Sequence, residues 1–282
     1  MKKILVTGAT GFVGGYVVEE LLRRGYQVIA SSSNHANASS KHWFEKVTYI
    51  EFDLKRFDEK LDYFKYFQSP DILIHLAWEG LPNYTHTFHL EENLPRHSAF
   101  LKNMLENGLK DITVTGTCFE YGMQEGCLSE DMEVHPSNAY AIAKNELRKG
   151  IESLSQQLKA SFKWVRLFYM YGKGQNPKSL ISQLDKALEN GEPVFNMSEG
   201  EQVRDFLPVE KVAEYIVSVA TQQQVAGIIN CCSGNPVYVK DFVEQYVSEK
   251  KKTIKLNLGY YEYAPYEPMR FWGDNRKLKL II

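Results

Sequence analysis

Residues 7–14 read TGATGFVG and follow the apolar run Ile4-Leu5-Val6 directly. The run predicts a buried strand, and residues 12–24 have the apolar spacing of a helix. Glycines at positions 8, 11 and 14 let the backbone turn tightly from strand to helix and let a ligand approach it closely. Because the free N–H groups of a helix N-terminus favour anions, this turn predicts a pyrophosphate site. The alternative is a structural turn that binds no ligand.

Strands and helices alternate outward from this turn. Strands are predicted at residues 4–6, 27–30, 47–50, 71–76, 111–116 and 162–168, and helices at 12–24, 85–107 and 137–158. This alternation predicts an α/β fold with a doubly wound parallel sheet, the Rossmann arrangement. Such sheets bind ligands at the carboxyl ends of their strands.

The pattern loosens after Gly172. Helices are predicted at 177–190, 209–220 and 239–247, and a strand at 225–231. We expect residues 1–170 to form a dinucleotide-binding Rossmann domain, to which the segment of about 203–232 returns. Residues 171–202 and 233–282 are expected to form a smaller C-terminal α/β substrate-binding domain. The aromatic-rich tail at 260–272 suits a packed wall or lid better than a linker.

Composition narrows the class of protein. The chain has 282 residues, of which 44% are hydrophobic, and a formal net charge of −2, which gives no case for a nucleic acid or an anionic membrane as partner. No apolar stretch approaches the roughly 20 residues of a membrane span. The four cysteines lack metal-ligand spacing. We therefore expect reduced thiols, no metal site and a cytoplasmic protein.

A second signal is Tyr140-Ala141-Ile142-Ala143-Lys144 on a predicted helix. A spacing of four places the phenol and the ammonium on one helix face. The ammonium should then draw the pKa of Tyr140 towards neutrality, so that the phenol can exchange a proton with a substrate oxygen. Alone, the pair fits a solvated helix face equally well. Thr117, however, lies just past the strand at 111–116, and we expect all three side chains at the sheet edge that the glycine turn faces.

Together these motifs resemble the extended short-chain dehydrogenase/reductase superfamily, in its branch of nucleotide-sugar epimerases, dehydratases and 4-ketoreductases. The resemblance runs from residue 4 to about 274. Besides TGxxGxxG, the threonine before Tyr-Gly and YxxxK, the matching positions are Asp53, His75-Leu76-Ala77, Asn93, Pro136, Arg166, Tyr171-Gly172, Arg204-Asp205-Phe206 and residues 270–274.

The resemblance implies a role for each matching residue. Thr117, Tyr140 and Lys144 would be catalytic: the first two hold the oxygen on the carbon that gains or loses hydride, and Lys144 also bonds the nicotinamide ribose. The expected cofactor contacts are Gly8, Thr10, Gly11, Phe12, Val13, Gly14, Ser31, Ser32, Asp53, Leu54, Leu76, Ala77, Tyr140 and Lys144. The expected substrate contacts are Thr117, Tyr169, Arg204 and Arg270, with the two arginines on the diphosphate.

The resemblance implies smaller roles for some other positions. Asp53 would accept a hydrogen bond from the adenine amino group, and Asn93 would support the site without reacting. His75 ends a buried strand and is expected to be a hydrogen-bonded core histidine. Tyr169 stands where members of the superfamily often have an asparagine that helps to hold the substrate. Glu120 and Cys118 lie near the expected site, and no step is assigned to them.

The end of the second strand bears on the choice of cofactor. It reads Ala30-Ser31-Ser32-Ser33-Asn34-His35, without the carboxylate that binds the adenosine ribose and selects NAD. Small hydroxyl side chains leave room for a 2′-phosphate, with His35 or Lys41 as its partner. We therefore expect NADP rather than NAD.

Departures from relatives bear on the reaction. Sugar 4,6-dehydratases similar to this chain carry Asp-Glu after the threonine, where Cys118-Phe119 stands here. The short length and the preference for NADP favour a reductase of a nucleoside-diphosphate 4-keto-6-deoxy sugar, with Tyr140 as the acid at the C4 oxygen. The alternatives are an NAD(P)-dependent 4-epimerase with the same residues and a non-catalytic NADP-binding regulator. The resemblance also implies a homodimer.

Overall fold

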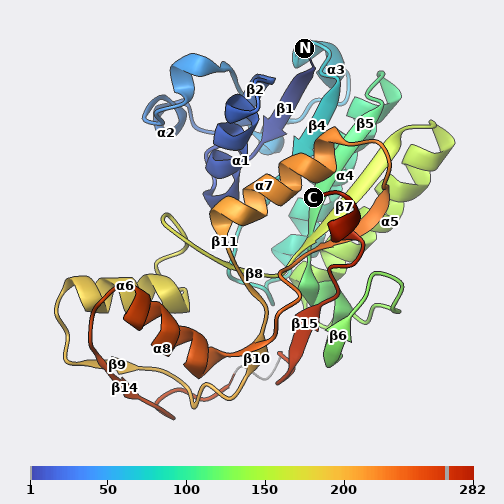
Figure 1. Cartoon of the computed structure of the whole chain (residues 1–282). Coiled ribbons are helices and arrows are strands. Elements are labelled where there is room, and N and C mark those ends of the chain that lie inside the picture. Colours follow the sequence, from blue (N-terminus) through green and yellow to red (C-terminus); the bar gives the residue numbers. More distant parts are fainter. Residues whose placement is uncertain (1, 264–266) are drawn as a thin grey trace.

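A seven-stranded parallel sheet forms the centre of the molecule, as a computed structural model describing residues 2–263 and 267–282 shows (Figure 1). The strand order is β12-β7-β5-β4-β1-β2-β3, and every neighbouring pair is parallel. The bounds are β1 Lys3–Thr7, β2 Gln27–Ser32, β3 Thr48–Glu51, β4 Ile72–His75, β5 Asp111–Thr117, β7 Ser161–Leu167 and β12 Gly227–Cys231. The strand order reverses between β1 and β4, where such sheets bind ligands. The predicted fold class is confirmed.

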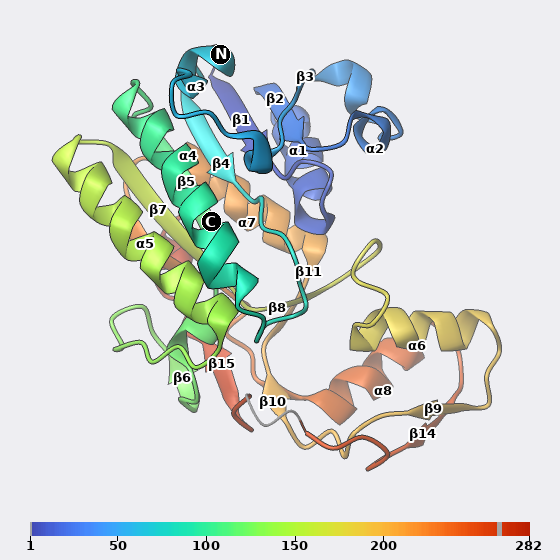
Figure 2. The same ribbon diagram turned by 180° about the vertical axis from the view of Figure 1, so that it is seen from behind.

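Helices cover both faces of this sheet (Figure 2). On one face α1 (Phe12–Arg23) and α7 (Val209–Thr221) form a core with alternate strand residues such as Ile4 and Val6. On the other face α4 (Leu94–Glu106) and α5 (Ala139–Gln157) pack with residues such as Leu5. Because both faces are buried, the central strands β1 and β4 contain continuous apolar runs, Ile4–Val6 and Ile72–Ile74.

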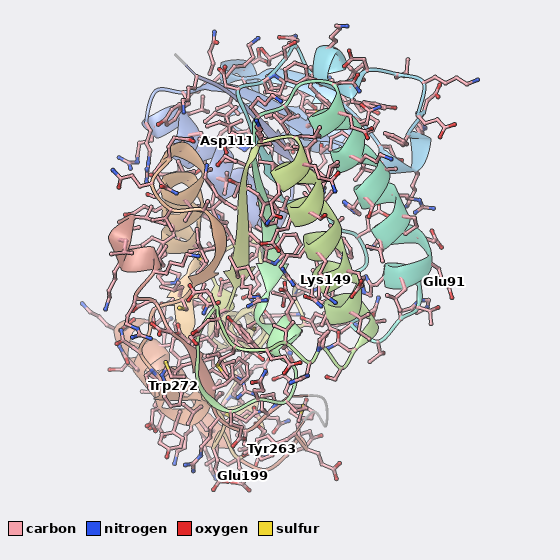
Figure 3. The ribbon with its side chains drawn as sticks, turned by 90° about the vertical axis from the view of Figure 1, so that its right-hand side faces the viewer. Glu91, Asp111, Lys149, Glu199, Tyr263 and Trp272 are labelled. Carbon is pink, nitrogen blue, oxygen red and sulfur yellow. The ribbon has the colours of Figure 1, made fainter. Side chains whose placement is uncertain are left out.

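Two elements from the later part of the chain lie on this sheet. β12 pairs in parallel with β7 at the sheet edge, and α7 packs beside α1. Most of the segment 203–232 therefore lies with the N-terminal part of the chain. Figure 3 shows α5 from outside, with Lys149 on its outer face and Asp111 at the amino end of β5. The short helices α2 (His35–Ser39) and α3 (Tyr63–Tyr66) complete this large part.

A smaller part lies beyond the carboxyl ends of the strands (Figure 1). Its core joins α6 (Leu180–Glu189) and α8 (Val239–Glu249) to the paired strands β9 (Val194–Asn196) and β14 (Lys255–Asn257). Three short strand pairs complete the secondary structure: β8 (Tyr169–Tyr171) with β11 (Phe206–Pro208), β10 (Val203–Arg204) with β13 (Val237–Tyr238), and β6 (Gly126–Leu128) with β15 (Phe271–Gly273). The independence of the two parts as domains, with the boundaries given above, stays a prediction.

The structure bears on two predicted segments, the tail at 260–272 and the helix at 85–107. Of the tail at 260–272, residues 264–266 lie outside the described residues, and residues 271–273 form β15. The helix predicted at 85–107 consists of a π-helical turn, His89–Asn93, followed by α4. None of the helices in the described part of the chain is both long enough and apolar enough to span a lipid bilayer.

Candidate active site

The glycine-rich turn joins β1 to α1 at the carboxyl edge of the sheet. Gly8 has a φ of +71°, and a Cβ there would lie 2.7 Å from the backbone nitrogen of Ala77, just past β4. A Cβ at Gly14 would lie 2.1 Å from the carbonyl oxygen of Gly8. The backbones are thus packed too closely for side chains. Because Gly11 precedes α1, no side chain caps the first N–H groups of the helix, and they can bind an anion.

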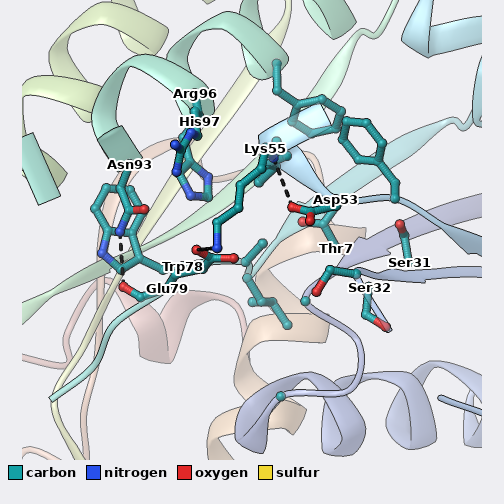
Figure 4. Close-up of a pocket in the computed structure, with 18 of the residues that line it drawn as sticks. Thr7, Ser31, Ser32, Asp53, Lys55, Trp78, Glu79, Asn93, Arg96 and His97 are labelled. Atoms are coloured by element: carbon teal, nitrogen blue, oxygen red, sulfur yellow. Dashed lines mark hydrogen bonds and ion pairs between the residues drawn. The ribbon is translucent and has the colours of Figure 1, made fainter. Parts of the chain in front are cut away.

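A cavity of about 220 Å³ opens beside this turn (Figure 4). Nine of the residues predicted to contact a cofactor line it: Gly8, Thr10, Gly11, Ser31, Ser32, Asp53, Leu54, Leu76 and Ala77. Thr7 and Trp78, which were not predicted, line it as well. A carboxylate oxygen of Asp53 accepts a hydrogen bond from the backbone N–H of Lys55 at 2.9 Å. We call this space the first cavity.

The charges around the first cavity are paired. Lys55 Nζ lies 2.9 Å from Glu79 Oε2, and an Arg96 guanidinium nitrogen lies 2.8 Å from Glu92 Oε2 (Figure 4 shows the former pair). Lys55 and Arg96 are the lysine and arginine side chains among the described residues that line this cavity. The lining therefore offers no unpaired lysine or arginine to a 2′-phosphate, and neither His35 nor Lys41 belongs to it.

A second cavity, of about 440 Å³, continues from the first. Gly8, Gly11, Leu76 and Trp78 line both, so one elongated ligand can lie along the turn from one to the other. The predicted site residues that line the second cavity and not the first are Phe12, Val13, Gly14, Thr117, Tyr140, Lys144 and Tyr169. The structure thus brings the hydroxyl, the phenol and the amine together beside the glycine turn.

Tyr140 lies in an aromatic enclosure and is 7% exposed. Its ring centroid lies 5.3 Å from that of His89, 5.7 Å from Tyr84 and 6.0 Å from Trp78. Burial raises the pKa of the phenol above its ordinary value, and a hydrogen bond with the Thr117 side chain acts in the opposite direction. The prediction that the pKa of Tyr140 is drawn towards neutrality is therefore wrong for this structure.

The position of Lys144 explains this difference. Its Nζ donates a hydrogen bond to the carbonyl oxygen of Thr115 at 2.9 Å and lies 4.1 Å from the centre of the Trp78 ring. Lys144 is 2% exposed, and burial lowers its pKa to about 7. The amine is thus directed at a backbone carbonyl and an indole ring, and at neutral pH it is only partly protonated.

Thr117 is held at the start of a short 3₁₀ helix, Cys118–Tyr121. Its Oγ1 accepts a hydrogen bond from the backbone N–H of Phe119 at 3.3 Å. Its own backbone N–H donates to Glu120 Oε1 at 2.9 Å, which completes a capping box. Because the hydroxyl oxygen accepts from Phe119, its hydrogen is left to point towards Tyr140 or a substrate oxygen.

The predicted substrate contacts are placed differently from one another. Tyr169 lines the second cavity, and its hydroxyl donates to Glu267 Oε2 at 2.8 Å. Arg204 is 2% exposed and donates to Glu267 Oε2 at 3.0 Å and to two backbone carbonyl oxygens. Arg270 is exposed, with its guanidinium 5.9 Å from the Tyr238 ring centre. Neither arginine lines the two cavities, and the diphosphate role of both stays a prediction.

Two residues that were expected to play supporting roles are buried and hydrogen-bonded. His75 is fully buried, with Nδ1 2.7 Å from Thr7 Oγ1 and Nε2 2.7 Å from His97 Nδ1, and burial lowers its pKa to about 3. It is the expected core histidine. The Asn93 side chain donates to the carbonyl oxygen of Glu79 at 3.1 Å and so holds the chain after β4 (Figure 4).

Sequence reasoning missed Trp78. This side chain lines both cavities, contacts Lys144 and donates from Nε1 to His89 Nδ1 at 3.1 Å. Its signal was available, because it directly follows Leu76-Ala77 at the carboxyl end of β4. Tyr84 was also missed. Its carbonyl oxygen accepts from the backbone N–H of Tyr140 at 2.9 Å, across a distance in sequence that no local pattern reveals.

Comparison with known proteins identifies the family. The model of the NAD-dependent epimerase/dehydratase family matches residues 4–232, most of the chain. The chain belongs to this family. It is therefore an enzyme of the extended short-chain dehydrogenase/reductase type, and its relatives act on nucleotide sugars.

Three relatives of this family member illustrate its range. The dTDP-6-deoxy-L-talose 4-dehydrogenase (NAD(+)) of Aggregatibacter actinomycetemcomitans is 32% identical over 96% of this chain and 98% of its own length. The UDP-glucuronate 4-epimerase of Thermodesulfobacterium geofontis (strain OPF15) is 26% identical over 99% and 89%. The fold is shared with the UDP-glucuronic acid 4-epimerase from Bacillus cereus in complex with UDP-glucuronic acid and NAD, with a TM-score of 0.84, 23% identity and coverage of 99% and 92%.

These findings overturn the prediction of NADP. The family is defined as NAD-dependent, and the talose dehydrogenase is named for NAD(+). The physical reason lies in the first cavity. The small side chains of Ser31 and Ser32 leave space, but a 2′-phosphate also needs positive charge, and Lys55 and Arg96 are already paired with carboxylates. A missing carboxylate at the end of β2 is not by itself a phosphate site.

Proposed function

We propose that this family member is an NAD-dependent 4-dehydrogenase of a nucleoside-diphosphate 6-deoxy sugar, which also catalyses the reverse reduction of the 4-keto sugar. The observation that carries the proposal is that Thr117, Tyr140 and Lys144 line one cavity that continues from the glycine turn. The 32% identity to a dTDP-6-deoxy-L-talose 4-dehydrogenase over nearly the full length of both chains supports the choice of reaction.

The turn and the first cavity fit NAD. Gly8, Gly11 and Gly14 would hold the pyrophosphate at the N-terminus of α1, where a Cβ at Gly8 or Gly14 would collide with backbone. Ser31 and Ser32 would contact the adenosine ribose, and Asp53 the adenine amino group. NAD, when bound, supplies the acceptor for the hydride that leaves C4 of the sugar.

The chain's own residues handle the proton. In the reduction, Tyr140 donates its phenolic proton to the C4 oxygen, and its raised pKa keeps the phenol protonated until then. In the oxidation, Tyr140 must accept the proton of the C4 hydroxyl. Before it accepts this proton, Tyr140 carries a negative charge. The Thr117 hydroxyl stabilises that charge, because its hydrogen bond lowers the pKa of the phenol. Lys144 in its protonated form would add a positive charge nearby and hold the nicotinamide ribose.

The lining of the second cavity favours a sugar without a carboxylate at C6. Lys144 is the single charged side chain among the described residues that line it, and it already donates to Thr115. Leu81, Tyr84 and Phe119 contribute apolar surface instead. A uronate carboxylate would therefore compete for Lys144, whereas a C6 methyl group can pack against the apolar lining.

A 4-epimerase is the second candidate, because a UDP-glucuronate 4-epimerase is 26% identical to nearly the whole chain. An epimerase would use the same three residues to oxidise and re-reduce C4. The expected homodimer also stays a prediction.

The test is an absorbance assay with dTDP-6-deoxy-L-talose and NAD or NADP. We expect NADH to form in proportion to the sugar oxidised, with NAD strongly preferred over NADP. Conversion of the sugar at C4 without net NADH would establish the epimerase instead. No conversion of this sugar, together with turnover of UDP-glucuronic acid, would contradict the preference for a 6-deoxy sugar.

A variant of Tyr140 tests its role as the proton donor and acceptor. We expect Tyr140→Phe to lower kcat by about 10²- to 10⁴-fold, the usual contribution of a general acid or base, without weakening NAD binding measured by protein fluorescence. The matched control is Tyr63→Phe, which alters a buried phenol in the core on the α4–α5 face. Equal kcat values for Tyr140→Phe and the wild type would refute the assignment.

A further inference from the structure

Two buried ion pairs join the neighbouring strands β5 and β7, one near each end. At the amino ends, Lys163 Nζ lies 2.7 Å from Asp111 Oδ1. At the carboxyl ends, Arg166 Nε lies 2.8 Å from Glu120 Oε2, where Glu120 belongs to the 3₁₀ helix that follows β5. Only the second pair is next to the proposed site, so the two pairs can be compared within one molecule.

The Glu120 carboxylate is 0% exposed and accepts hydrogen bonds from three separate groups. Oε1 accepts from the backbone N–H of Thr117 at 2.9 Å and from Trp164 Nε1 at 2.9 Å. Oε2 accepts from Arg166 Nε at 2.8 Å. A Cβ added to Gly116 would lie 2.4 Å from Oε1, so the carboxylate is packed directly against the backbone of β5 and has no room to move towards it.

A gain in folding stability does not explain why the Glu120 carboxylate is buried here. A buried ion pair contributes little or nothing over well-packed apolar residues of similar volume, because both charges lose their water. The Arg166 Nη1 atom is even left without a hydrogen-bond partner in the described structure. What the Glu120 carboxylate does achieve is to fix the backbone of Thr117, the residue whose hydroxyl faces Tyr140.

We propose that Glu120 is a positioning residue for the C4 reaction: it fixes Thr117 against β5 and β7 and places a negative charge beside Tyr140 and Lys144. This inference rests on the proposed function of Thr117 and Tyr140. Glu120 contacts Thr117 through the backbone and does not itself line either cavity, so it acts through the threonine and through its charge.

The negative charge of Glu120 affects the pKa values of its neighbours in a defined direction. Glu120 raises the pKa of Tyr140 and that of Lys144, in each case as a smaller contribution than burial. Glu120 is hydrogen-bonded to Arg166 and Trp164 from β7 and to Thr117, and its charge also acts on Cys118. Of these, Arg166 is positive, with its guanidinium 4.5 Å from the Tyr121 ring centre. Loss of the Glu120 charge removes this contribution and therefore lowers the pKa of Tyr140 and that of Lys144.

The experiment compares Glu120→Gln with Asp111→Asn in the full-length enzyme. Each variant removes the negative partner of one buried pair between β5 and β7. For Glu120→Gln we expect kcat to fall about 10- to 100-fold, as for a misplaced catalytic group, with the KM for NAD unchanged. The rise of the oxidation rate with pH should shift to lower pH, because Tyr140 loses its proton more easily. Asp111→Asn should lose thermal stability and keep the wild-type kcat and pH profile.

Two results would overturn the proposal. One is a wild-type kcat and pH profile in Glu120→Gln. The other is an equal fall of kcat in both variants, which would mean that any lost ion pair between these strands has the same effect. If Glu120→Gln does not fold, Trp164→Phe removes a donor to the carboxylate and keeps the ion pair. It should lower kcat without shifting the pH profile, and a wild-type kcat in that variant would contradict the proposal.

The proposed function is tested separately, by the wild-type enzyme. If the wild type proves to be a 4-epimerase, the same variants are compared in the epimerase assay, since Thr117 and Tyr140 would handle the C4 oxygen there too. A negative dehydrogenase assay of the wild type therefore contradicts only the proposed function. The Glu120 proposal fails only if Glu120→Gln behaves like the wild type or like Asp111→Asn.

Discussion

Burial moves the pKa values of Tyr140 and Lys144 in opposite directions, and each shift disfavours the charged form of its side chain. At neutral pH the phenol is therefore neutral, and the amine exchanges its proton close to pH 7. A small change in the charge nearby can then change the protonation of Lys144 at the pH at which the enzyme works. This is the property that a proton-transfer site needs.

A variant of Lys144 should separate stability from activity. We expect Lys144→Met to lower kcat by at least about 10²-fold and to raise the melting temperature. The amine has a pKa of about 7 in the folded chain and an ordinary value of 10.5, so the unfolded chain binds more protons between these values. The burial of Lys144 thus lowers the free energy of unfolding by its full amount below pH 7. This loss of stability decreases as the pH rises towards 10.5.

The measurement is thermal unfolding of both proteins from pH 6 to pH 10. Lys144→Met should have the higher melting temperature, and the difference should be largest at the acid end and decrease with rising pH. At the acid end it should correspond to on the order of a few kcal/mol of unfolding free energy. A difference that stays constant over this range would show that the Lys144 ammonium is not desolvated in the folded enzyme.

At the scale of single elements, the structure agrees best with the sequence where both sides of a segment are buried. The strands of the central sheet were found at the predicted places, most clearly β1 and β4, whose burial on both faces makes their centres continuous apolar runs. The predicted helix at 85–107 was less accurate. A π-helical turn at His89–Asn93 precedes α4, and there Asn93 reaches the carbonyl oxygen of Glu79. That contact joins the helix to a segment before it, and helical periodicity does not report it.

Two adjacent glycines of α1 give a matched test of the turn. In Gly14→Ala the new Cβ would lie 2.1 Å from the Gly8 carbonyl oxygen, so the turn must shift. We expect NAD affinity to fall about tenfold or more and stability to fall by roughly 1–3 kcal/mol. In Gly15→Ala the nearest atom is 3.9 Å away, at Trp43 Nε1. That variant should bind NAD normally and gain about 0.5–1 kcal/mol.

Both variants are measured by titration with NAD and by denaturant unfolding. The comparison separates the effect of a methyl group on the helix from its effect on the turn, since both substitutions lie within the same helical turn. Normal NAD affinity in Gly14→Ala would mean that the close approach of Gly14 to Gly8 is unimportant for the cofactor.

At the scale of the whole molecule, the segment around Asp205 connects the sheet to the smaller part. The Asp205 carboxylate is buried and accepts from the backbone N–H groups of Ser233 at 2.7 Å and Gly234 at 2.8 Å, just after β12. Next to it, Arg204 is bound by Glu267 from the C-terminal tail. Residues distant in sequence thus meet at the edge of the second cavity, where Tyr169 also contacts Glu267.

This arrangement makes a prediction about Arg204. If its guanidinium binds the substrate diphosphate, Glu267 competes with the substrate for it. Glu267→Ala should then lower the KM for the nucleotide sugar several-fold, and Glu267→Gln should have a smaller effect in the same direction. Steady-state kinetics at fixed saturating NAD measures both. A KM that rises in Glu267→Ala would show that this carboxylate supports the substrate site, and that Arg204 is held there for structure.

The sequence by itself determined the parallel sheet, the glycine turn and the residues Thr117, Tyr140 and Lys144, because these depend on local spacing and on apolar runs. Only the tertiary structure decided the charge states and the partners of these residues. The pKa of Lys144 depends on its burial between Trp78 and β5, and the position of Thr117 depends on Trp164 and Arg166 from another strand. The cofactor was predicted wrongly for the same reason: the pairing of Lys55 with Glu79 brings together the segments that follow β3 and β4, and electrostatic interactions depend on distance in space.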